Sequence, residues 1–173
     1  QRISVTQKQS VRDALMLIEK GHDGKEIKQI LEEDKFNSSI YIMLDTLKYL
    51  KKGGRITPAA AAIGTVLKLK PVLQIQGEKL DAFAKARTIN QGKKIMIDAI
   101  RNDVNTRFGG EDPDNISIHI AHTNNHDMAM EFKAEFEEAF PGVIVKDVDE
   151  LSLVVSCHIG PGALAVAVCK TLK

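Results

Sequence analysis

The sequence has no tryptophan, only two cysteines, and no apolar run long enough to span a bilayer. Two cysteines are too few for a disulfide framework, so we expect Cys157 and Cys169 to be small core residues. The N-terminus lacks a basic-then-apolar signal pattern, which together with the missing span indicates a cytoplasmic protein. The sequence also has no phosphate-binding loop with its lysine, no Ser-His-Asp order and no paired-carboxylate motif. Its motifs therefore do not indicate an enzyme.

The length and composition are those of one folded domain. The chain has 173 residues, of which 43% are hydrophobic and 27% charged, so we expect a single domain over residues 1–173 with a substantial core. A net charge of +1 gives no reason to expect a nucleic acid as partner. The charge is uneven, because residues 46–77 hold six Lys or Arg and no acid, whereas residues 127–150 hold eight acids and two lysines. We therefore expect a locally positive surface.

Apolar periodicity predicts most of the secondary structure. A helix opens at the capping-box pattern of Thr6 to Gln9 and buries Val11, Leu15 and Ile18. Two further helices are expected to begin at Asp23 and at Thr57-Pro58, and one is expected to end at Gly53. Two more are expected over residues 90–108 and 125–140. Strands are expected at 40–45, 69–76, 79–87, 116–120, 143–148, 151–159 and 164–168. The second and third of these strands form an antiparallel hairpin, and the last two turn about residues 160–162. This pattern predicts an α/β fold of the α+β type, a mainly antiparallel sheet covered by helices.

His158, just before the turn at residues 160–162, is the most interesting candidate for chemistry. From the residues alone, a surface histidine at a turn is the plain interpretation. A Cys157-His158 dyad is disfavoured, because neighbours in a strand point to opposite faces. A metal site is also disfavoured, since His119 and His122 have opposite parity in a strand and His126 lies beyond a break.

The basic segment around Arg55 allows three interpretations. The lysines Lys51 and Lys52 could simply be the solvated end of a helix, which favours cations. Arg55 and these lysines, with Arg87, could bind a carboxylate or phosphate, for which the forked guanidinium group of arginine is suited. It could also dock an acidic partner. Nucleic acid is disfavoured, because Tyr49 is the only aromatic residue in the segment.

Three segments resemble the DegV family of bacterial fatty-acid-binding proteins. They read DTLKYLKKGGRI to LKLKPVL (residues 45–73), KART to GKK (85–94) and CHIGPGALAVA (157–167), in the order and rough spacing of that family. The last segment is similar to the family signature HTGPGAL, except that Ile159 stands where Thr is common. The resemblance spans nearly the whole chain, but implies only the C-terminal lobe. The N-terminal lobe, whose Ser and Thr residues help hold the fatty-acid carboxylate, has no counterpart in this sequence.

The resemblance implies a carrier of a long-chain fatty acid, without a cofactor. It implies that His158 binds the carboxylate, with Arg55 near the opening and a turn that shapes the site. The turn residues are Gly160, Pro161 and Gly162. Small and apolar side chains leave room for an acyl chain; the expected lining residues are Ala60, Ile63, Leu67, Leu164 and Val166.

The resemblance also implies two partners, a fatty acid kinase that receives the bound acid and the missing N-terminal lobe. An isolated C-terminal lobe should expose apolar surface, so we expect it to bind fatty acid weakly and to self-associate. Two alternatives from other classes stay open. One is an enzyme that uses His158 or the region of His119, and the other is a lobe that only binds a protein partner.

Overall fold

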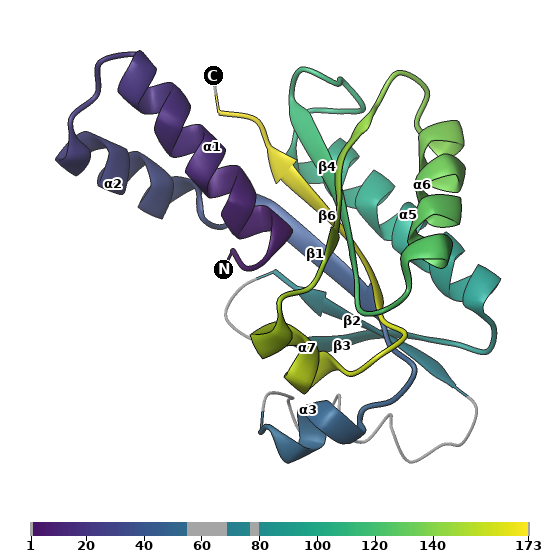
Figure 1. Ribbon diagram of the computed structural model, residues 1–173. Coiled ribbons are helices and arrows are strands. Elements are labelled where there is room, and N and C mark those ends of the chain that lie inside the picture. The colour runs from purple at the N-terminus through teal and green to yellow at the C-terminus, as the bar shows by residue number, and fades with distance from the viewer. Residues whose placement is uncertain (1, 55–68, 77–79, 173) are drawn as a thin grey trace.

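The computed structural model describes residues 2–54, 69–76 and 80–172, and a six-stranded sheet is its centre (Figure 1). The strands are β1 (Ser38–Met43), β2 (Lys70–Ile75), β3 (Asp81–Ala86), β4 (Ile116–His122), β5 (Val145–Glu150) and β6 (Leu164–Lys170). Their order is β3-β2-β1-β6-β4-β5. Only the β4–β5 pair is parallel among these neighbours. The predicted fold class, a mainly antiparallel sheet covered by helices, is confirmed.

Helices cover both faces of the sheet. They are α1 (Val5–Glu19), α2 (Gly24–Asp34), α3 (Lys48–Lys52), α5 (Ile89–Arg107), α6 (His126–Ala139) and α7 (Leu153–Ile159). Figure 1 shows α5 and α6 on one face, α1 and α2 on the other, and α3 and α7 close together beyond one end. No helix within these described residues combines the length and apolar content needed to cross a membrane.

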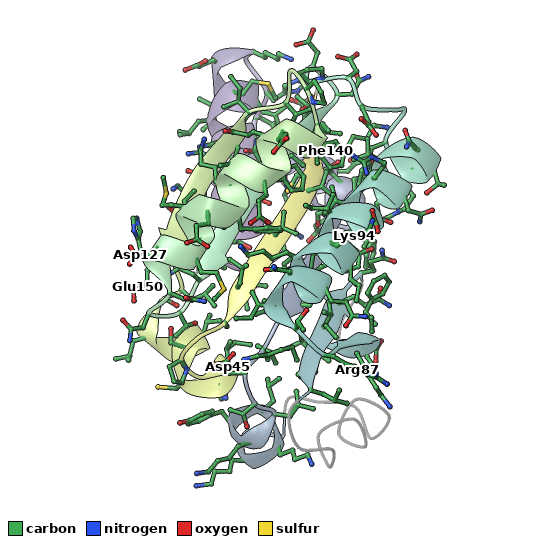
Figure 2. The ribbon with its side chains drawn as sticks, turned by 90° about the vertical axis from the view of Figure 1, so that its right-hand side faces the viewer. Asp45, Arg87, Lys94, Asp127, Phe140 and Glu150 are labelled. Carbon is green, nitrogen blue, oxygen red and sulfur yellow. The ribbon has the colours of Figure 1, made fainter. Side chains whose placement is uncertain are left out.

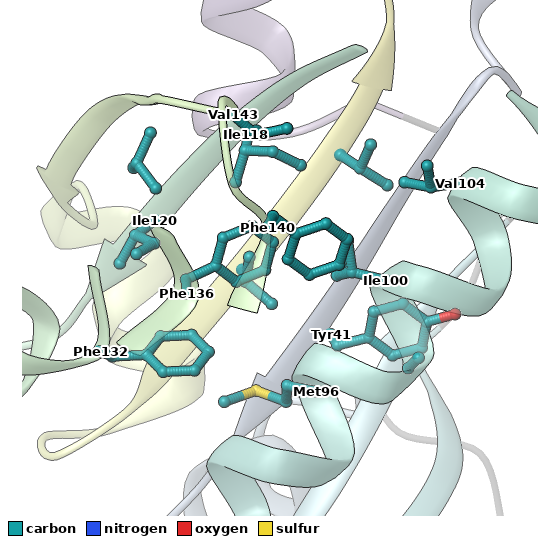
Figure 3. Packing of buried hydrophobic residues seen from close by; sticks show 14 of the residues in the cluster. Tyr41, Met96, Ile100, Val104, Ile118, Ile120, Phe132, Phe136, Phe140 and Val143 are labelled. Carbon is teal, nitrogen blue, oxygen red and sulfur yellow. The ribbon is translucent and has the colours of Figure 1, made fainter. Parts of the chain in front are cut away.

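The main core lies between the sheet and the helices α5 and α6. Phe132, Phe136 and Phe140 form the apolar stripe predicted for α6, and Phe136 stacks on Phe140 with ring centroids 4.6 Å apart. They pack near Met96 and Ile100 of α5, as Figure 3 shows. The stripe is therefore predictable from helical spacing alone, because every fourth residue returns to the same face.

The start of α5 offers a direct test of helix capping. The Thr88 side chain accepts a hydrogen bond from the backbone N–H of Gln91 (3.2 Å). Thr88→Ala should lower the free energy of unfolding by about 1 kcal/mol, because that amide loses its partner. Thr106→Ala makes the same change at an exposed site in the same helix, where alanine is the better helix former, and should change stability by less than about 0.5 kcal/mol. Urea denaturation measures both, and equal losses would rule out capping as the cause.

Helix α1 buries a different face from the one expected. Val11, Leu15 and Ile18 are 54%, 56% and 58% exposed, and the buried side chains include Gln9 and Asp13. The prediction for the apolar stripe was wrong, because the surface under α1 includes the polar side chains of Ser117, His119 and Asp147. The expected capping box is also absent, since α1 begins at Val5 without a side-chain cap.

A partly buried cluster of charged and polar side chains joins α1 to the sheet. Arg12 donates two hydrogen bonds to the Asp147 carboxylate, at 2.6 and 2.9 Å, and the Lys8 ammonium lies 2.7 Å from the same group. On the sheet side, His119 Nδ1 lies 2.7 Å from Asp147 Oδ2 and Nε2 lies 3.1 Å from Ser117 Oγ. Because a carboxylate only accepts, Nδ1 donates to Asp147 and Nε2 accepts from Ser117. Asp147 therefore holds α1 and β4 together.

The segment expected as a strand over 151–159 is largely the helix α7. A strand there would have to pair with β6 about the Gly160–Gly162 turn, but β6 is already paired with β1 on one side and β4 on the other. The apolar run that indicated a strand is instead at the surface, with Leu153 79% and Val154 74% exposed. One expectation for the cysteines also fails, because Cys169 is buried but Cys157 is exposed.

Candidate functional site

The Gly160–Gly162 turn joins α7 to β6 and packs against α3 and the residues just before it. Gly160 has φ +87°, and a Cβ there would lie 2.5 Å from the Tyr49 ring. Gly162 has φ +81°, and a Cβ there would lie 2.5 Å from the Asp45 carboxylate. Only glycine meets both demands, since the left-handed backbone disfavours side chains and no space is left for one. The predicted turn therefore exists, but it connects a helix to a strand.

The loop between β4 and α6 fixes this turn from the other side. The Gly162 N–H donates to Thr123 O (2.8 Å), and the Thr123 N–H donates to Ala163 O (3.1 Å). The Asn125 side chain, at the residue before α6, makes no capping hydrogen bond and donates to Gly162 O (3.1 Å). Asp45, Tyr49 and Asn125 thus hold the turn. Sequence reasoning missed these roles because each contact joins segments far apart in the chain.

His158 lies in the last turn of α7, half-buried against the end of α3. A Cβ on Gly53 would lie 2.6 Å from His158 Nδ1, so the imidazole rests directly on that glycine. The structure therefore places His158 beside the Gly53-Gly54 corner. Arg55 follows this corner in the sequence but lies outside the described residues.

The basic residues around this corner are exposed. Lys51 and Lys52 form the end of α3, and Lys51 and Lys48 line a depression of about 340 Å³ with Thr46 and Leu47. Next to the turn, Lys70 pairs with Asp45 at 2.6 Å, which balances one of these charges.

Four charged residues outside the basic segment lie on two sides of the molecule. Figure 2 shows Arg87 and Lys94 on one side, and Asp127 and Glu150 on the opposite side. Arg87 is exposed between β3 and α5.

Two of the five predicted lining residues are among those that the structure describes. Leu164 and Val166 are fully buried in the main core, on the face of β6 that α5 and α6 cover. Ala165 and Ala167 point to the other face, into a second apolar cluster with Ile42 and Leu73. Ala60, Ile63 and Leu67 lie outside the described residues. The part of Leu164 and Val166 in lining an acyl chain therefore stays a prediction.

The other candidate residues are not assembled into a catalytic or metal site. Cys157 and His158 are neighbours on a helix, where consecutive side chains do not face each other, so helix geometry now disfavours the dyad. His119 is enclosed under α1 by Asp147 and Ser117. Within residues 2–54, 69–76 and 80–172, no three His, Cys, Asp or Glu side chains are grouped to hold a metal ion.

Comparison with known sequences identifies relatives over most of the chain. A family model described as an uncharacterised protein of the DegV family matches residues 1–171. A DegV domain-containing protein of Clostridium acetobutylicum is 34% identical over 148 residues, which are 84% of this chain and 49% of the relative. One from Streptomyces coelicolor is 35% identical over 131 residues, 76% of this chain and 44% of the relative. The chain thus spans about half the length of the curated relatives it matches.

Solved structures share the fold over nearly the whole chain. A stearic acid-binding protein from Eubacterium ventriosum has a TM-score of 0.86 at 21% identity, covering 98% of this chain and 57% of its own. A DegV family protein from Thermus thermophilus, described by its fatty acid binding, has a TM-score of 0.79 at 26% identity. DegV from Bacillus subtilis, a fatty acid binding protein, has a TM-score of 0.77 at 28% identity. These last two matches each cover 95% of this chain and 56% of the other.

Proposed function

This chain is a member of the DegV family, and we propose that it binds a long-chain fatty acid as a carrier. The observation that carries the proposal is the position of His158, which packs against Gly53, the residue after the exposed Lys51 and Lys52, and precedes the Gly160–Gly162 turn. The solved relatives at 26% and 28% identity, which share its fold, are fatty-acid-binding proteins by their descriptions. A half-buried imidazole can donate an N–H to a carboxylate, and its fixed neighbours reduce the entropy lost on binding.

The carboxylate and the acyl chain of the ligand would contact different kinds of side chain. His158 would donate to the carboxylate, and Arg55 would add a guanidinium fork that suits the planar acid group. For the acyl chain, the alanine face of β6 suits the role better than Leu164 and Val166, because small side chains such as Ala165 and Ala167 leave room beside the sheet. The cluster on that face would supply apolar contacts along the chain of the acid.

The proposed role is to carry the acid and not to transform it. The carboxylate would be presented to a separate fatty acid kinase, and the exposed Lys51 and Lys52, with Arg87, are the surface on which an acidic partner could dock. We further propose that the full-length protein has an N-terminal lobe that completes the site, since the relatives are about twice as long as the matched region.

Mass spectrometry of lipid extracted from the purified full-length protein tests the carrier function. We expect a long-chain fatty acid in near-stoichiometric amount, because a site closed over an acyl chain releases it slowly. Protein that contains no fatty acid after mild purification, and that takes none up in titration, would contradict the carrier function and leave the two alternatives, an enzyme and a protein-interaction lobe.

The 173-residue chain by itself should bind fatty acid more weakly than the full-length protein. The exposed stripe of Val11, Leu15 and Ile18 on α1 is apolar surface that another lobe or a second copy can cover, so we also expect the isolated chain to self-associate. Titration with a labelled fatty acid and light scattering measure the two effects. Equal affinity of the isolated chain and the full-length protein would contradict the expectation that the second lobe completes the site.

A further inference from the structure

We propose that Gly53 is a positioning residue, whose missing side chain sets the orientation of the His158 imidazole toward the ligand. The inference rests on the proposed function and concerns the same site. Gly53 is the residue that follows α3, and its backbone N–H donates to Tyr49 O (2.9 Å). A Cβ at this position would lie 2.6 Å from His158 Nδ1 and 3.3 Å from Cε1. Atoms of these types do not approach so closely, so a side chain here must displace something.

The imidazole is the part that would move. Gly53 has φ −81°, which alanine adopts without strain, and the nearest backbone atom, Tyr49 O, would be at an ordinary 3.5 Å. The helix ends themselves are held, because the Gly160 N–H donates to Ser156 O (2.8 Å) and Gly160 packs against the Tyr49 ring. Rotation of the His158 side chain to another rotamer costs less than moving either helix. A methyl group at Gly53 therefore reorients the ring and leaves the fold in place.

A reoriented ring should lose its hydrogen bond to the carboxylate. Hydrogen bonds weaken steeply when the donor angle falls, so a rotation that shifts the N–H direction removes most of the contribution of His158. Gly53→Ala should then reproduce the effect of His158→Ala without touching His158 itself. Gly24→Ala is the matched control, because a Cβ on Gly24 at the start of α2 meets nothing within 4 Å.

The first measurement needs no ligand. In NMR spectra of the full-length protein with labelled histidine, Gly53→Ala should shift the imidazole resonances of His158, whereas Gly24→Ala should leave them unchanged. Resonances of His158 that are unaffected by Gly53→Ala would overturn the proposal.

The second measurement is a double-mutant cycle on ligand affinity. Gly53→Ala should weaken binding of a long-chain fatty acid about ten-fold and of the matching fatty alcohol less than about two-fold. The double variant should bind the acid no more weakly than His158→Ala alone, because both changes remove one contact. Gly53 does not act through His158 if the double variant loses affinity by the product of the two single-variant factors. The same holds if Gly53→Ala weakens binding of the acid and of the alcohol equally. If the unmodified protein binds neither ligand, the proposed function fails, and a shift in the NMR spectra would then report only a packing contact.

Discussion

Replacing His158 with alanine in the full-length protein is expected to lower its affinity for a long-chain fatty acid about ten-fold to over a hundred-fold. A hydrogen bond to a charged group contributes about 1.5–3 kcal/mol, and the carboxylate would lose this partner in a poorly hydrated site. A histidine that contacts only water would give a change within about 0.5 kcal/mol. The two ranges do not overlap, so a fluorescence or calorimetric titration separates them.

Two controls identify the cause of that loss. The matching fatty alcohol has no charge, so His158→Ala should weaken its binding much less. His22→Ala makes the same substitution between α1 and α2, where the ring contacts only the exposed Glu26 among polar groups of the described residues (3.3 Å), and should leave affinity unchanged. Equal losses for acid and alcohol would mean that His158 acts through the shape of the Gly160–Gly162 turn.

Apolar periodicity predicted an element correctly where the neighbouring structure buries the face that the pattern marks as apolar. The β2–β3 hairpin followed from the alternation along residues 79–87, and the stripe of Phe132, Phe136 and Phe140 followed from helical spacing. The face of α1 and the helix α7 could not be predicted in this way. The first depends on the polar cluster under α1, and the second depends on β6 having no free edge. Both are decided by what lies opposite the segment, which periodicity does not contain.

The sequence indicated some residues of the candidate site but none of the contacts between them. His158 and the turn were found through the resemblance of residues 157–167 to a family signature. The contact between His158 and Gly53 joins segments that are far apart in sequence, and no spacing rule relates them. The cluster around Asp147 was missed for the same reason, since Arg12 and His119 reach it from distant elements. The alternation of residues along a strand predicts the face on which a side chain lies, but not the residue that it contacts.

Asp147→Asn is expected to lower the free energy of unfolding by about 2–3 kcal/mol at pH 7, or the melting temperature by about 5–10 °C. Asparagine keeps the shape and an acceptor for His119 but removes the charge that Arg12 and Lys8 share. The loss should fall below that of a fully enclosed ion pair. Arg12 and Lys8 are partly exposed, so they can turn toward water when the carboxylate is gone.

The same cluster makes stability depend on pH. Arg12, with Lys8 and His119, holds the pKa of Asp147 well below its usual range against the opposing effect of burial, and burial lowers the pKa of His119 against the attraction of Asp147. Both groups therefore bind a proton more readily in the unfolded chain. Their stabilisation is fully present above the unfolded pKa values, about 6.5 for His119 and about 3.9 for Asp147, and is lost progressively as the pH falls below each. Burial raises the pKa of Asp13, which gives a smaller effect of opposite sign.

Urea denaturation of the unmodified protein and Asp147→Asn at pH 7, 5 and 3.5 measures both effects. The difference between the two proteins should be largest at pH 7 and should shrink below about pH 4, where the unfolded Asp147 takes up a proton. Asp149→Asn is the matched control, because Asp149 is partly exposed and shares only Lys8, and it should cost less than about 1 kcal/mol. If both variants lose the same amount, the effect is one of net charge on β5. A larger loss for Asp147→Asn that shrinks at pH 3.5 indicates a carboxylate that α1 and His119 hold in the folded protein.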